Sequence, residues 1–187
     1  MRRSGCLHRV GHLVGRFFGS LRPGGPSSAD EAWVAGLLGA GELDLWRRMS
    51  DADRRHAVGV ARRVKSVLGG DGPELVAVVA GGVAPLLAAA LLHDVGKVRC
   101  GLGTFGRVAA TLLGAVAPGR TAGWSDRGGA RGRIGLYLRH PEEGATLLSE
   151  AGSDPLTVVW ATEHHRPPDC WTVDRRLAEV LHAVDDD

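Results

Sequence analysis

The stretch LAAALLHDVGK, residues 87 to 97, decides the fold that the sequence predicts. Its first six residues are Ala and Leu, and from Pro85 to Leu92 the chain is apolar on all sides, as expected of a central buried helix. The stretch then ends in His93 and Asp94. A histidine and a carboxylate are costly to bury unless other groups pair with them. The rest of the chain should therefore supply partners for both.

Length and composition favour one helical domain with a short N-terminal appendage. The chain has 187 residues, of which 44% are apolar, enough for one sizeable core. The stretch PGGPSS, residues 23–28, has the composition of a linker. Residues 1–28 are thus predicted to be a basic arm with its linker, and residues 29–187 the domain. Helical periodicity recurs between Gly, Pro and Asp breaks without the alternation typical of strands, so we expect an all-α fold.

Charge and cysteine content restrict the class of protein. The formal net charge is +2, from 23 Lys and Arg against 21 Asp and Glu, and gives no signal for nucleic-acid binding. Cys6, Cys100 and Cys170 lie far apart and cannot all pair, which suits a reducing cytoplasm. Composition leaves the oligomeric state open.

Two segments are similar to membrane or targeting signals. The N-terminus is basic but lacks the apolar run of a secretory signal. Residues 7–18 could form a short basic amphipathic helix, for which packing or disorder is favoured over membrane contact. Residues 75–92 carry no charge, but Gly81, Gly82 and Pro85 divide them, so two buried helices fit better than a transmembrane segment.

Helix caps and apolar stripes locate the first polar residues. Ser50 and Asp53 match a capping box, and the helix that they begin turns His56 to the same side as its valines, Val60, Val64 and Val67. Gly96 is expected to adopt the left-handed conformation that ends the central helix. The free carbonyls at that helix end favour positive charge, so a cation fits beside His93 and Asp94.

Three later helices are expected, over residues 141–150, 155–165 and 174–184. His140 would be a corner residue before the first of them, because a residue that precedes proline avoids helical dihedrals. The second helix ends in His164 and His165. Asp185 extends the apolar stripe of the third.

Taken alone, each of these polar residues has an ordinary explanation, such as a core histidine, a helix cap, a turn residue or an acidic tail. Together they are hard to explain in that way, because five of the eight histidines and two aspartates occur at helix ends or on buried stripes. Their order along the chain is H, HD, H, HH, D, from His56, His93, Asp94, His140, His164, His165 and Asp185.

This order resembles the HD superfamily of metal-dependent phosphohydrolases, in particular its two-metal branch. The resemblance covers residues 52–187, and HDVGK, from His93 to Lys97, is its most specific part. It implies an HD-domain-like orthogonal bundle of helices. It also implies that one divalent cation is held by His56, His93, Asp94 and Asp185. A second would be held by His140, His164 and His165, with Asp94 bridging the two.

The chemistry of these side chains agrees with a hydrolytic metal centre. Imidazole and carboxylate are ligands for Fe, Mn, Zn, Co or Ni, and no thiolate takes part. Two cations about 4 Å apart can hold a bridging hydroxide in line with a phosphorus atom. The predicted substrate is a small phosphomonoester or phosphodiester such as a nucleotide, with Asp94 and Lys97 as catalytic residues. Lys97 would bind a phosphate or stabilise developing charge; the alternative is a surface lysine near a helix C-terminus.

Several departures limit what the resemblance implies. Relatives that cleave cyclic di-GMP follow the double histidine with a longer Glu, Asp-Gly and Gly-Tyr-Pro signature, whereas this chain continues as RPPDC, so that substrate is not expected. Ala52 stands where some relatives have a glutamate for a third metal, so two metals are the upper expectation. The Gly- and Arg-rich insertion, residues 119–133, is either a lid or, as we favour, a flexible loop. A lid could offer an anionic substrate one of four arginines: Arg107, Arg131, Arg133 or Arg139.

Two other functions stay open at this point. Some relatives use the same ligand order to hold two irons and activate O₂ on a diol or phosphonate. An oxygenase would purify with iron and consume O₂, whereas a hydrolase would release phosphate. A non-catalytic signalling module that keeps its metals for stability would bind metal without turnover, and the complete ligand set argues against it.

Overall fold

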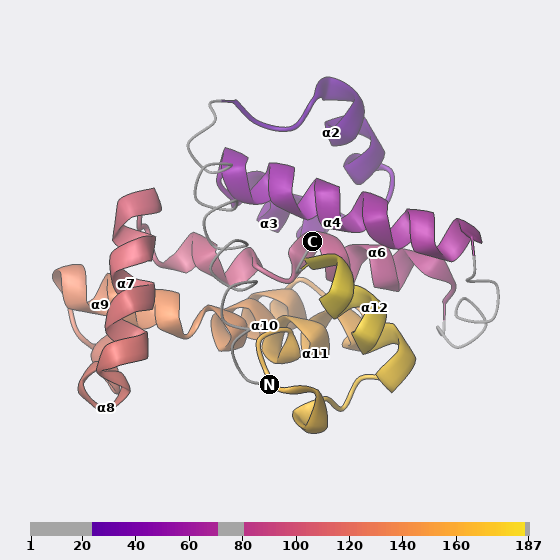
Figure 1. The fold of residues 1–187 in the computed structure, drawn as a ribbon. Helices are drawn as coiled ribbons and strands as arrows, with labels where there is room; N and C mark the ends of the chain where they lie inside the picture. The colour runs from indigo at the N-terminus through magenta and orange to yellow at the C-terminus, as the bar shows by residue number, and fades with distance from the viewer. Residues whose placement is uncertain (1–23, 71–80, 186–187) are drawn as a thin grey trace.

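The computed structural model describes residues 24–70 and 81–185, and all regular structure within these ranges is helical (Figure 1). The all-α prediction is confirmed. In chain order the α-helices are α2 (Ser28–Ala35), α3 (Ala40–Arg48), α4 (Asp51–Gly70), α6 (Val83–Leu92), α7 (Thr104–Val116), α8 (Pro118–Thr121), α9 (Gly129–Leu138), α10 (His140–Glu150), α11 (Pro155–Glu163) and α12 (Arg175–Asp185). Short 3₁₀ helices are η1 (Val95–Arg99), η2 (Trp124–Asp126) and η3 (Pro168–Cys170).

Helix α6 is the centre of the core, as its composition predicts. All seven residues from Leu86 to Leu92 are buried. The helix packs against α4 on one side and α11 on the other, while α10 packs on α11 and η1, and α12 packs on α4 (Figure 1). Within residues 24–70 and 81–185, no helix combines the length and apolar character needed to cross a membrane.

Predicted caps and stripes agree with the structure except at the edges. Ser50 Oγ accepts from the Asp53 amide at 3.2 Å, which is one half of the expected capping box, and the Asp53 carboxylate accepts from the Ser50 hydroxyl at 2.6 Å. Val60 and Val64 are buried, but the prediction for Val67 is wrong, since it is 38% exposed. The next residue, Leu68, is buried instead.

Several predicted boundaries shift by one or two residues. The helix expected over residues 155–165 ends at Glu163, and the one expected over 174–184 spans Arg175–Asp185. Ser27 lies in the predicted linker but caps α2 by accepting from the Asp30 amide, and Ser28 is the first helical residue. His140 is the first residue of α10 instead of a corner before it. Pro141 is tolerated there because an amide in the first turn of a helix has no intrahelical acceptor to lose.

The prediction for Gly96 is wrong, and the reason matters for the site. Helix α6 ends at Leu92, and the chain then enters the 3₁₀ helix η1. Gly96 lies in η1 and is not among the described glycines with positive φ. Glycine is needed here for a close approach. A Cβ on Gly96 would lie 1.9 Å from the His140 carbonyl oxygen and 2.6 Å from the Gly144 amide nitrogen. Its missing side chain lets the start of α10 lie directly against η1.

The insertion at residues 119–133, expected as a flexible loop, is helical. It comprises α8, η2 and the first half of α9. Glycines again explain the close packing, because a Cβ on Gly132 or Gly135 would meet backbone atoms of Arg127 and Ser125 at 1.9 and 2.1 Å. Gly132, one of the glycines that suggested flexibility, is therefore a position at which α9 packs closely on the preceding segment.

Candidate metal centre

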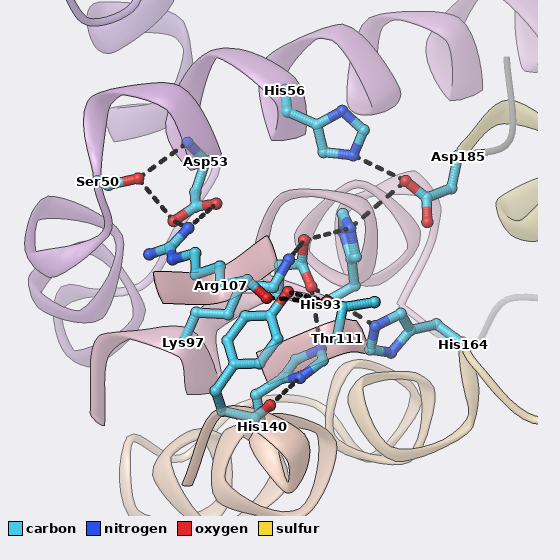
Figure 2. A network of polar contacts seen from close by, with 12 residues as sticks. Ser50, Asp53, His56, His93, Lys97, Arg107, Thr111, His140, His164 and Asp185 are labelled. Atoms are coloured by element: carbon cyan, nitrogen blue, oxygen red, sulfur yellow. Dashed lines mark hydrogen bonds and ion pairs between the residues drawn. The ribbon is translucent and has the colours of Figure 1, made fainter. Parts of the chain in front are cut away.

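The seven predicted ligands come from five separate parts of the chain and meet at the C-terminal end of α6. Figure 2 shows five of them: His56, His93, His140, His164 and Asp185. Their donor atoms form two groups, in each of which all atoms lie within 4.8 Å of one another. One group is Asp94, His140, His164 and His165; the other is His56, His93 and Asp94. Asp185 adjoins the second group, with Oδ1 2.8 Å from His56 Nε2 and 3.6 Å from His93 Nε2. Asp94 belongs to both groups.

Three of the histidines are held in the same way by the backbone. The Nδ1 atoms of His93, His140 and His164 lie 2.8–2.9 Å from the carbonyl oxygens three residues earlier, those of Ala90, Tyr137 and Ala161. A carbonyl oxygen can only accept, so each Nδ1 carries the proton. In a neutral imidazole, Nε2 is then an unprotonated acceptor.

The three Nε2 atoms point at one carboxylate. His140 Nε2 and His164 Nε2 lie 3.2 and 3.6 Å from Asp94 Oδ1, and His93 Nε2 lies 3.5 Å from Asp94 Oδ2. All three are buried without a hydrogen-bond partner within the described part of the chain. A nitrogen lone pair and a carboxylate oxygen that face each other repel unless a cation lies between the two atoms. A hydrogen bond from the other ring nitrogen to a carbonyl is also how metal-ligating histidines are usually oriented.

The charges in this cluster agree with that arrangement. Burial alone would raise the pKa of Asp94, but the nearby Lys97 ammonium holds it well below its ordinary value, so the carboxylate is ionised. Burial lowers the pKa of His164 to about 4, more than the Asp94 carboxylate raises it. His164 is therefore a neutral imidazole near pH 7, the form that binds a metal.

Lys97 lies against the cluster instead of on the surface. It belongs to η1, its side chain is 11% exposed, and its ammonium contacts Asp94 Oδ2. The alternative of a surface lysine does not describe this environment. Lys97 places a positive charge at the edge of the two groups that could hold a metal ion.

His165 lies on the exposed side of the cluster. The residue as a whole is exposed, unlike His93, His140 and His164, yet its ring lies against that of His164, with ring centres 3.9 Å apart. Loss of hydration around the ring and the neighbouring His164 lower the pKa of His165 to about 2. Two surface hollows, one beside Arg62 on α4 and one beside Pro85 on α6, include no residue of the cluster.

Two residues that the sequence interpretation missed hold the ligands in position. Arg63 donates through Nε and Nη2 to the Val184 carbonyl oxygen, at 2.9 and 2.7 Å, which fixes the end of α12 beside Asp185. Glu163 is buried and accepts from the Thr172 amide and hydroxyl and from the Val173 amide. It ties the chain after His164 and His165 back to α11. The position of Glu163 directly before the double histidine could have indicated its supporting role. Nothing in the sequence distinguished Arg63 from the other arginines of α4.

Four arginines were predicted as possible contacts for an anionic substrate, and of these Arg107 contacts α4, the helix that carries His56. Its Nη1 contacts both oxygens of Asp53, one turn before His56, at 2.8 and 2.7 Å (Figure 2). Burial would lower the pKa of Arg107, but Asp53 raises it above its ordinary value. Arg131 lies over the Trp124 ring and Arg139 donates to Ser125, while Arg133 is exposed.

Comparison with known proteins adds no relative to this description. No family model matches the chain, and neither the curated proteins nor the solved structures contain a significant match. The interpretation of the cluster therefore depends on its own geometry. The buried His and Asp groups could hold a metal ion.

Proposed function

We propose that this chain is a metal-dependent phosphohydrolase of the HD type, acting on a small phosphomonoester or phosphodiester such as a nucleotide. The observation that carries the proposal is the convergence of three backbone-oriented histidine Nε2 atoms on the buried Asp94 carboxylate. The resemblance of the ligand order to the HD superfamily supports the same reaction class.

The ligand set supports two divalent cations. His56, His93, Asp94 and Asp185 would hold the first, and His140, His164, His165 and Asp94 the second, in line with the two groups of donor atoms. Nitrogen and oxygen donors without thiolate fit Fe, Mn, Zn, Co or Ni. When bound, such cations polarise phosphate oxygens and lower the pKa of water.

The chain's own residues account for the remaining requirements of phosphoester hydrolysis. Asp94 stays ionised when buried and so keeps two negative oxygens available to cations on both sides. Lys97 offers an ammonium beside Asp94 Oδ2, where it would bind a substrate phosphate and stabilise the charge that develops as the ester bond breaks. The neutral His164 leaves its lone pair available without first losing a proton near pH 7.

A metal analysis followed by a substrate screen tests the proposal. The purified protein should contain close to two transition-metal ions per chain, and the Mn²⁺-loaded form should release phosphate or nucleotide from a panel of nucleoside phosphates and cyclic nucleotides. His93→Ala should lose both properties, whereas His182→Ala, whose ring packs on Trp171 outside the cluster, should retain them. Metal-loaded protein that hydrolyses nothing overturns the proposal. Iron-dependent O₂ consumption without hydrolysis assigns the centre to an oxygenase instead.

Lys97→Met should lower kcat by about 10- to 100-fold while the metal content stays at the wild-type value, because the ammonium stabilises charge on the substrate and does not ligate metal. The matched control is Lys65→Met, since Lys65 lies over the Trp33 ring away from the cluster. Steady-state kinetics and elemental analysis of the two variants make the comparison. Unchanged kcat in Lys97→Met would remove Lys97 from the catalytic residues.

A further inference from the structure

Arg107, near the start of α7, joins three parts of the chain beside the candidate metal centre (Figure 2). Its Nη1 contacts both carboxylate oxygens of Asp53, at 2.8 and 2.7 Å, and its Nε donates to the Leu102 carbonyl oxygen at 3.0 Å. Asp53 lies on α4 one turn before His56, and Leu102 lies in the segment between η1 and α7. One guanidinium therefore holds the start of α7 against both α4 and that segment.

The ion pair between Arg107 and Asp53 is partly buried. The two side chains are 20% and 11% exposed, and the Asp53 carboxylate also accepts from the Ser50 hydroxyl at 2.6 Å. Water and salt screen such a pair much less than a pair on the surface, and the planar guanidinium presents its donors in a fixed geometry. The contact therefore defines how α7 lies relative to α4.

Helix α7 connects Arg107 to α9. The two helices pack on each other, and a Cβ on Gly114 of α7 would meet the Leu138 side chain of α9 at 2.6 Å. Thr111, one turn after Arg107, donates through Oγ1 to the Arg107 carbonyl oxygen at 3.0 Å, and the same Oγ1 lies 3.3 Å from the Tyr137 hydroxyl. Because Tyr137 belongs to the last turn of α9, the position of α7 restrains that of Tyr137.

Tyr137 in turn orients the predicted ligand His140. Its carbonyl oxygen accepts from His140 Nδ1 at 2.8 Å, and the two ring centres lie 5.7 Å apart. This hydrogen bond leaves His140 Nε2 facing Asp94 Oδ1 at 3.2 Å. A partner on the second ring nitrogen fixes the orientation of a ligating histidine, and its loss typically costs about 10- to 100-fold in metal affinity.

We propose that Arg107 is a positioning residue for the second cation, because its ion pair with Asp53 holds α7 and α9 so that Tyr137 keeps the His140 imidazole aimed at Asp94. The proposal rests on the proposed function in assigning His140 to a metal. It also separates Arg107 from the substrate contact that the sequence left open, since Nε and Nη1 already bond within the protein.

Isothermal titration of the metal-free full chain with Mn²⁺ tests the proposal. Arg107→Gln should weaken the binding of one of the two cations by at least about tenfold. The other cation should be little affected, since α4 and α6, which lead to His56 and His93, pack directly on each other. Arg107→Lys, which keeps the charge beside Asp53, should recover part of the affinity. Adding Arg107→Gln to His140→Ala should cause no further loss, because Arg107 acts through His140.

Arg54→Gln is the matched control. Arg54 lies 2.7 Å from Glu31 in an ion pair, and its side chain is 19% exposed, close to the value for Arg107. Its partner belongs to α2, however, which carries no residue of the cluster. Both variants should unfold at a lower denaturant concentration than the wild type, but only Arg107→Gln should lose metal affinity. This comparison separates a positioning role from a general loss of stability.

A second readout needs no metal. In isotope-labelled, metal-free protein, the proton on His140 Nδ1 should exchange with water at least about tenfold faster in Arg107→Gln than in the wild type, because its hydrogen bond to Tyr137 is loosened. The signal is assigned by its absence from His140→Ala.

The wild-type exchange rate in Arg107→Gln, or the wild-type affinity for both cations, overturns the proposal. A raised KM with unchanged metal affinity also overturns it and assigns Arg107 to the substrate instead. A wild-type chain that binds no cation would overturn both this proposal and the proposed function. One that binds two cations without hydrolysis would overturn the proposed function alone, so the two failures are distinguishable.

Discussion

Asp94→Asn is expected to lower the affinity for divalent cations by at least about 100-fold and to abolish hydrolysis. The Asp94 side chain is 2% exposed and belongs to both groups of donor atoms. Asparagine keeps its shape but removes the negative charge and presents an NH₂ group either to the Lys97 ammonium or to the histidine lone pairs. One substitution should therefore disable both groups.

The measurement is the metal content after dialysis against a known free Mn²⁺ concentration, together with isothermal titration of the metal-free protein. Asp154→Asn is a matched control, because Asp154 caps α11 by accepting from the Leu156 amide at 2.8 Å, and asparagine caps as well as aspartate. Wild-type metal content in Asp94→Asn would contradict the bridging role. A near-native circular dichroism spectrum of the variant separates loss of a ligand from loss of the fold.

Gly96→Ala is expected to destabilise the protein by about 3 kcal/mol and to weaken metal binding at the same time. The added methyl group would lie 1.9 Å from the His140 carbonyl oxygen, a backbone atom that can move only with α10. Because η1 carries Lys97 and α10 carries His140, separating the two elements also moves His140 from its position 3.2 Å from Asp94.

Chemical denaturation of the metal-free protein measures the first effect, and metal titration measures the second. The control is Gly69→Ala near the end of α4, where a Cβ meets nothing within 4 Å and should instead stabilise the helix by about 0.5–1 kcal/mol. If Gly96→Ala unfolds at the same denaturant concentration as the wild type, the close contact between η1 and α10 does not support the site.

The central helix and the residue types of the candidate site could be predicted from the sequence, since both follow from local patterns. An uninterrupted apolar run ending in His93 and Asp94 requires a buried helix with polar partners. The period of 3.6 residues puts His56 and Asp185 on inner stripes, and the observed contact of 2.8 Å between them joins those stripes.

The errors have a common physical cause. Gly96 and Gly132 were interpreted through their conformational freedom, whereas the structure uses them for close contacts, with His140 elsewhere in the chain and with Arg127 across a turn. Backbone preferences are local and can be estimated from neighbours. A requirement for hydrogen in place of Cβ depends on which backbone lies opposite, and that is a property of the packed structure.

The sequence by itself determined an all-helical core around residues 86–92. It also determined the order along the chain of the His and Asp residues that meet at the C-terminal end of this core helix. Periodicity and capping act within a few residues, so they are readable without the fold. Only the tertiary structure decided that His93, His140 and His164 turn Nε2 toward one carboxylate, and that Gly96 lies against the backbone at the start of α10. Both features arise from distances between segments far apart in the chain, which packing sets.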